Sequence, residues 1–140
     1  MKQKAYNTNL AAEYYVLSML YRKGFDAHLT LGNKKSIDII IEKEDGSLLT
    51  VDVKGLGGKT CWPMDNFAKE LKSHFIILVS FLDKIHDHMT LPECWIVPST
   101  KIKNLLYKNP KGNRKVIGRY GEKGMLQMGL RFKDNWSLLK

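Results

Sequence analysis

The sequence predicts an α/β fold with a mixed β-sheet at its centre, and three observations support this prediction. Apolar residues recur at helical spacing from Leu10 to Tyr21, and Gly24 follows as a helix stop. Three strand-like segments come next, separated by short turns. Further on, the apolar run from Phe75 to Phe81 is rich in β-branched residues and is typical of a central strand buried on both faces. Together these segments indicate an α/β sandwich.

The three strands after the first helix are predicted to form an antiparallel meander. We expect them at residues 27–31, 36–42 and 48–54. The turn sequences GNKK (32–35) and KEDGS (43–47) separate them, and the second has Asp-Gly at its centre. Turns as short as these join neighbouring antiparallel strands.

The rest of the chain alternates helix and strand signals. Ser99 and Thr100 follow a proline and suit the start of a helix. We expect a helix at 64–73, a strand at 94–97, a helix at 101–107, a weak hairpin of 115–120 with 125–130, and a helical turn at 135–139.

Length and composition set the class of protein. A chain of 140 residues fits one domain, and we expect residues 1–140 to form it, with the basic segment 101–140 included. No apolar run approaches the ~20 residues of a membrane span, and tyrosines and Glu13 interrupt any signal-like segment near the N-terminus. These features predict a cytoplasmic protein in which Cys61 and Cys94 are reduced thiols.

The net charge of +9 comes entirely from the last part of the chain. Residues 1–100 hold twelve Lys/Arg and twelve Asp/Glu, whereas residues 101–140 hold eleven Lys/Arg against two Asp/Glu. A balanced body with a basic end suits a polyanion partner such as nucleic acid, and a solvated surface that binds nothing specific is the alternative. The candidate phosphate contacts are Lys59, Lys101, Lys103, Lys108, Lys111, Arg114, Lys115 and Arg119.

Two acidic residues lie within apolar strand segments, where a carboxylate is costly to bury without a cation or strong donors. Asp38 belongs to the run SIDIII, and Asp52 belongs to LTVDVKG, two residues before Lys54. Because alternate side chains of a strand share a face, Asp52 and Lys54 point the same way. Pairing of the two strand ends brings Asp38 beside Asp52, and two adjacent carboxylates need a shared proton or a divalent ion. With a lysine close by, the set matches the requirements of phosphodiester hydrolysis.

These residues, together with Glu13 in the first helix, resemble the PD-(D/E)xK nuclease superfamily, which includes archaeal Holliday junction resolvases and many restriction endonucleases. The resemblance spans about residues 8–100, and it departs from the family pattern at Ile37, where proline is expected. It implies a restriction-endonuclease-like three-layer α/β/α sandwich with a central mixed β-sheet. It also implies a Mg²⁺- or Mn²⁺-dependent nuclease that hydrolyses DNA.

The same resemblance implies a role for each residue of the site. Asp38, Asp52 and the Val53 carbonyl would bind the metal ion, and Glu13 would reach it directly or through a water molecule. Lys54 would orient or deprotonate the attacking water. A homodimer would suit the cutting of two strands, by family analogy alone.

Other interpretations of these residues stay open at this point. Asp52 and Lys54 could form a weak ion pair on a surface hairpin, with Asp38 hydrogen-bonded and structural. The chain could also be a nucleic-acid-binding or interaction module without turnover, or a nuclease directed at RNA. A nucleotide-binding P-loop is excluded, because Val53 stands where the motif needs glycine. The glycines at 55, 57 and 58 are therefore expected to let the chain leave the strand.

Overall fold

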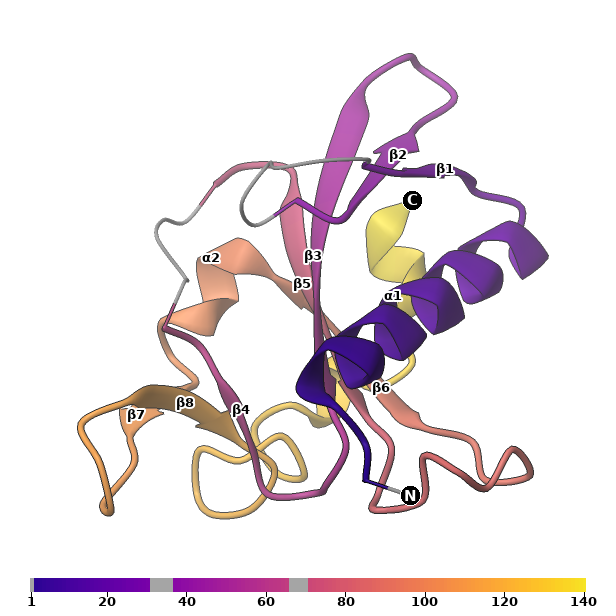
Figure 1. Cartoon of the computed structure of the whole chain (residues 1–140). Coiled ribbons are helices and arrows are strands. Elements are labelled where there is room, and N and C mark those ends of the chain that lie inside the picture. Colours follow the sequence, from indigo (N-terminus) through magenta and orange to yellow (C-terminus); the bar gives the residue numbers. More distant parts are fainter. Residues whose placement is uncertain (1, 31–36, 66–70) are drawn as a thin grey trace.

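A mixed five-stranded sheet forms the centre of the protein, as seen in the computed structural model, which describes residues 2–30, 37–65 and 71–140 (Figure 1). The strand order is β1-β2-β3-β5-β6. The β3–β5 pair is parallel and the other pairs are antiparallel, so the predicted meander of β1, β2 and β3 is confirmed. The strands are β1 (Asp26–Leu29), β2 (Ile39–Glu42), β3 (Leu48–Leu56), β5 (His74–Ser80) and β6 (Glu93–Pro98).

The first face of this sheet is covered by the long helix α1 (Ala5–Arg22) and by the short C-terminal helix η2 (Trp136–Leu139) (Figure 1). The helix buries a stripe that includes Ala12, Val16 and Leu20 against the sheet. It ends as the sequence predicts, because Gly24 adopts a φ of +83°, which a glycine reaches without strain.

The opposite face is covered by a second, smaller sheet and by short helices (Figure 1). The strand order of the small sheet is β4-β8-β7, and all its pairs are antiparallel. The elements on this side are β4 (Cys61–Pro63), α2 (Ser99–Ile102), β7 (Leu106–Lys108), β8 (Lys115–Gly118) and η1 (Leu130–Phe132). The predicted α/β sandwich around a mixed sheet is confirmed, and its second outer layer combines a helix with a small sheet.

Strand β5 contributes to the cores on both faces, as its continuous apolar sequence predicts. Ile77 and Val79 pack in the core under α1, while Ile76 and Leu78 pack in the core under the small sheet. All four side chains are fully buried. Burial of an aliphatic side chain of this size contributes about 1.5–3 kcal/mol, so β5 is a large source of stability for the sandwich.

Several predicted elements of the second half are wrong in type or extent. The helix expected at 101–107 already begins at Ser99 and ends at Ile102, and Tyr107 lies in strand β7. The predicted hairpin of 115–120 with 125–130 is absent from the described residues. Residues 125–129 form turns. Strand β8 instead forms a hairpin with the preceding β7 and pairs on its other side with the distant β4, and these pairings outweigh the weak signal at 125–130.

Other predictions fall partly outside the described residues. Of the helix expected at 64–73, residues 64–65 and 71–73 are not helical, and residues 66–70 lie outside the described part of the chain. The predicted GNKK turn also lies outside it. Within residues 2–30, 37–65 and 71–140, no helix has the length and apolar character that crossing a membrane requires. Both cysteines are free, in line with the prediction.

The glycine at position 55 has a packing role that differs from the predicted exit from the strand. Gly55 still lies within β3, directly beneath α1. A Cβ atom at this position would lie 2.9 Å from the Ala12 Cβ and 3.0 Å from the Thr8 carbonyl oxygen. The absence of a side chain therefore lets the helix and the strand approach each other closely.

We expect Gly55→Ala to lower the free energy of unfolding by about 1–3 kcal/mol, because the added methyl group forces α1 and β3 apart. Gly57→Ala is the matched control, since its Cβ would lie 3.9 Å from the Thr8 Cγ2, an ordinary contact distance. Urea unfolding of both variants measures the difference. Equal stability of the two variants would show that the close approach is not needed.

Candidate active site

Asp52 and Lys54 lie next to each other on one face of strand β3. Asp52 is opposite Ile76 of β5, so the two side chains face the core beneath the small sheet, while Val51 and Val53 face α1. The Lys54 Nζ is 3.4 Å from the Asp52 Oδ2, and the side chains are only 23% and 7% exposed. The pair is thus largely withdrawn from water and is not the exposed surface ion pair that the sequence left open.

Asp38 lies just before β2 and is tied to β3 by its backbone and its side chain. Its N–H donates to the Val51 carbonyl at 2.7 Å, and its Oδ2 accepts the Val53 N–H at 2.7 Å. The Asp38 side chain thus extends the hydrogen bonding between β2 and β3 past the first residue of β2. Because the N–H and C=O of one strand residue point the same way, the Val53 carbonyl faces the Asp38 side of β3.

Glu13 reaches the same place from the half-buried side of α1. Burial is the main cause that raises its pKa to about 7, and the neighbouring carboxylates of Asp38 and Asp52 add to the rise. A glutamate on a helix that responds to two aspartates from the sheet lies close to both of them. The helix and the two strand segments therefore bring three carboxylates together.

Burial also raises the pKa of Asp52, to about 7, even though the ammonium group of Lys54 acts in the opposite direction. The Asp38 carboxyl contributes to the rise as well. Asp38 is a neighbour that raises the pKa of both Glu13 and Asp52, and we call these three residues the carboxylate cluster.

The donor set of the carboxylate cluster consists of oxygen atoms, which hard divalent cations such as Mg²⁺ and Mn²⁺ prefer. In the described part of the chain, no three side chains of the His, Cys, Asp or Glu type are arranged to hold a metal ion as they stand. Asp38 Oδ2 is engaged with a backbone amide, and Asp52 faces Lys54. The chemistry of the donors nevertheless suits such an ion.

The basic residues predicted to contact phosphate have different environments. Arg119 is largely buried and pairs with Glu93, with distances of 2.8 Å from its Nη2 to Oε1 and 3.2 Å from its Nε to Oε2. Arg114 forms an exposed ion pair with Asp65. The other predicted contacts lie at exposed positions, and within residues 2–30, 37–65 and 71–140 they form no ion pair; they are Lys59, Lys101, Lys103, Lys108, Lys111 and Lys115.

A groove of about 340 Å³ opens beside Lys54. It runs between the first turns of α1 and strand β4, and the last residues of β3 form its floor. Thr8 and Asn9 line the groove although nothing in the local sequence around them predicts a binding role. The residues that line it are Ala5, Thr8, Asn9, Lys54, Gly55, Leu56, Gly57, Trp62 and Pro63.

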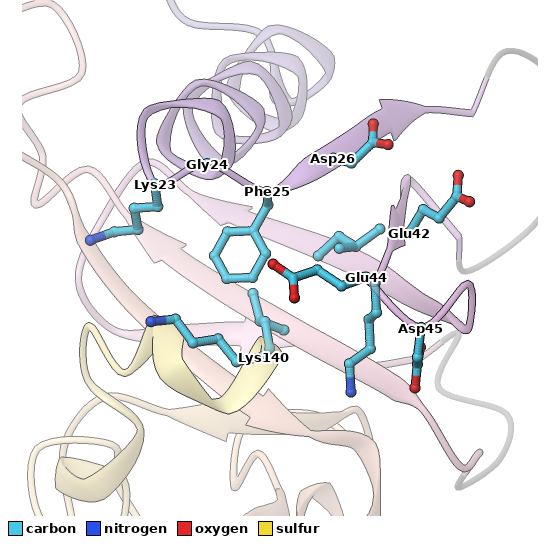
Figure 2. A pocket seen from close by; sticks show the side chains of 11 residues that line it. Lys23, Gly24, Phe25, Asp26, Glu42, Glu44, Asp45 and Lys140 are labelled. Atoms are coloured by element: carbon cyan, nitrogen blue, oxygen red, sulfur yellow. The ribbon is translucent and has the colours of Figure 1, made fainter.

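A larger cavity, of about 700 Å³, lies apart from the carboxylate cluster (Figure 2). The end of α1, the turn after β2 and the last two residues of the chain line it, and none of the predicted site residues does. Figure 2 shows the Glu44 carboxylate beside the Phe25 ring, with the amines of Lys23 and Lys140 opposite. The mixture of charges and the position at the far end of α1 separate this cavity from the candidate chemistry.

The chain therefore combines an α/β sandwich with a cluster of acidic residues and a lysine at β3, the middle strand of its central sheet. In three dimensions it is similar to a solved bacterial homing endonuclease, I-Ssp6803I, with a TM-score of 0.61 and 12% sequence identity. The match covers 97% of this chain and 92% of that one. At this identity the similarity establishes a shared fold. No family model matches the sequence, and no curated protein matches it at a significant level.

Proposed function

We propose that this protein is a metal-dependent nuclease that hydrolyses DNA phosphodiester bonds, as a member of the PD-(D/E)xK superfamily. The observation that carries the proposal is the meeting of Glu13, Asp38 and Asp52 beside the amine of Lys54. The fold supports it, because the similar solved structure is, by its name, an endonuclease. Fold alone does not specify chemistry, so the site residues decide the argument.

Asp38, Asp52 and the Val53 carbonyl are the groups that would hold Mg²⁺ or Mn²⁺, with Glu13 acting directly or through a water molecule. A bound divalent ion supplies a Lewis acid at the phosphate and lowers the pKa of water. The raised pKa values of Glu13 and Asp52 favour this assignment, because burial and, to a lesser extent, neighbouring carboxylates disfavour their charged forms, and a bound cation would offset both effects.

In the proposed reaction, a water oxygen forms a bond to phosphorus, and the bond from phosphorus to one ester oxygen breaks. The water gives up a proton to solvent, and the leaving oxygen gains one. Lys54 orients the water by hydrogen bonding, and its positive charge offsets the charge that develops on the phosphate oxygens. The exposed lysines of the basic segment bind the DNA backbone.

We also propose that residues 1–140 act as one domain. The basic segment 101–140 supports this, because Ile117, Met125 and Phe132 pack in the same core as Ile76 and Leu78 of the central sheet.

The direct test is to incubate the purified protein with Mg²⁺ or Mn²⁺ and a panel of branched, duplex and single-stranded DNAs, with RNAs of the same sequences. We expect cleavage of DNA that stops in EDTA and in the Lys54→Ala variant, which removes the amine beside Asp52. Products of RNA alone would redirect the assignment to ribonuclease activity. Binding without cleavage in any metal would favour a module that lacks turnover.

Metal binding gives a second test that does not depend on turnover. We expect the protein to bind Mn²⁺ and the Asp38→Asn variant to lose that binding, because one anionic ligand is removed. Asparagine keeps an oxygen that accepts the Val53 N–H, so Asp38→Asn retains the end of the β2–β3 ladder. Asp38→Ala loses that bond and is expected to unfold more easily, by about 1 kcal/mol.

Calorimetric titration with Mn²⁺ and thermal unfolding of both Asp38 variants separate the two roles of this residue. Undiminished Mn²⁺ binding by Asp38→Asn would remove Asp38 from the proposed ligand set.

A further inference from the structure

The groove beside Lys54 adjoins the carboxylate cluster and could bind a part of the DNA that the cluster itself does not contact. Lys54 belongs to both, since it lines the groove and lies 3.4 Å from the Asp52 carboxylate. A strand of DNA with its phosphate at Lys54 therefore continues directly into the groove. On the basis of the proposed nuclease function, we propose that this groove binds one unpaired nucleotide of the DNA strand that is cut.

The size of the groove favours a single nucleotide. Pockets that hold one small ligand measure about 300–1,000 Å³, and this groove, at about 340 Å³, lies at the lower end. A group of one nucleotide's dimensions fits such a volume, whereas a duplex with two backbones and paired bases does not. The nucleotide next to the cut must therefore leave its base pair or lack one.

The walls of the groove are held in place by the fold. On one side, the indole of Trp62 is fully buried, and its Nε1 donates to the Val79 carbonyl at 3.0 Å. On the other side, the first turns of α1 are fixed against Gly55, where the added Cβ would touch Ala12. A groove with rigid walls selects its occupant by shape, and binding does not carry the entropic cost of ordering mobile segments.

The groove offers both space and polar groups to a nucleotide. Gly57 in its floor leaves room, because a Cβ there would be 3.9 Å from the nearest atom, the Thr8 Cγ2. Asn9 is exposed at its wall and carries both a donor and an acceptor, which can pair with a base edge. Lys54 provides the charge for the adjoining phosphate.

The inferred substrate is thus DNA with an unpaired nucleotide beside the scissile phosphate, such as a single strand, a flap or a branch. A fully paired duplex must first extrude a nucleotide, which costs free energy, and an unpaired one avoids most of that cost. We expect the protein to bind an unpaired site at least about tenfold more tightly than the same sequence fully paired.

The test measures binding by fluorescence anisotropy in EDTA, where a metal-dependent nuclease does not cut. The probes are a labelled duplex, the same duplex with one unpaired nucleotide, and the labelled single strand. Gly57→Leu fills the groove and is expected to remove the tenfold preference, by weakening binding of the unpaired site to the level of the paired duplex. Gly112→Leu adds the same side chain in an exposed turn outside the groove, where a Cβ meets nothing within 4 Å; it is the matched control and is expected to keep the preference.

A second pair of variants keeps the test valid if Gly57→Leu does not fold, as judged by circular dichroism. Asn9→Ala is expected to weaken binding of the unpaired site about threefold to tenfold, by loss of its hydrogen bonds. Asn7→Ala removes the same side chain from an exposed position two residues away, outside the groove, and is expected to change nothing.

The inference is wrong if the parent protein shows no preference for unpaired sites, or if a folded Gly57→Leu keeps it. Because binding in EDTA does not require hydrolysis, the two proposals fail separately. A protein that prefers unpaired DNA but never cuts it would contradict the nuclease function and leave the groove assignment intact. A protein that cuts DNA without this preference would do the opposite.

Discussion

The Asp52→Asn variant is expected to cut DNA at least about 10²–10³ times more slowly than the parent protein in Mg²⁺ or Mn²⁺. Asparagine has nearly the same shape as aspartate, so the packing of β3 is kept. What the substitution removes is the negative charge that faces Lys54 and that would bind the metal ion. Single-turnover cleavage of a labelled DNA, with protein in excess, measures the rate of the chemical step without product release.

Asp26→Asn is a matched control for this experiment. It removes the same charge from a side chain that is 63% exposed and paired with His28, on strand β1. We expect it to cut at the parent rate. Equal rates for Asp52→Asn and the parent protein would show that the chemistry, if any, takes place elsewhere.

The same Asp52→Asn substitution is expected to stabilise the metal-free protein at alkaline pH. The pKa of Asp52 lies near 7 in the folded protein and near 3.8 without the fold, so the unfolded state holds its charge more easily. A group with a raised folded pKa favours folding while it is protonated, and that contribution is lost as the pH rises from about 4 to about 7. Asparagine has no such charge to bury and avoids this loss.

We expect the melting temperature of Asp52→Asn to exceed that of the parent by about 3–10 °C at pH 8 in EDTA, and the difference to vanish near pH 4. Thermal unfolding across this pH range checks the prediction. Adding Mg²⁺ should raise the melting temperature of the parent and not that of the variant, since a ligand stabilises the state that binds it. A variant less stable than the parent at pH 8 would mean that the contact with Lys54 outweighs burial.

Much of the fold follows from local sequence patterns, because the first half of the chain uses short connections. The meander of β1, β2 and β3 follows from strand-like segments separated by turn sequences, and β5 follows from a continuous apolar run. The small sheet could not be predicted in the same way. Its strand β4 is three residues long, includes Pro63, and pairs with β8 more than fifty residues later.

The candidate site shows the same division. Asp52 and Lys54 share a face because strands alternate, and this could be derived from sequence alone. The position of Glu13 near both aspartates depends on the close packing of α1 on β3. Gly55 permits this packing because it has no side chain. The groove depends on β4 as well, and no local sequence pattern reveals that residues of β4 and of the distant first turns of α1 line the same groove.

The two aspartates of the site are expected to have different fates during evolution. Asp38 holds the Val53 amide, so its loss weakens the sheet, whereas Asp52 is a burden to the metal-free fold. Where nuclease activity is no longer under selection, substitution of Asp52 is therefore expected to occur first, because it increases the folding stability of the protein. We therefore expect homologues without nuclease activity to retain Asp38 more often than Asp52.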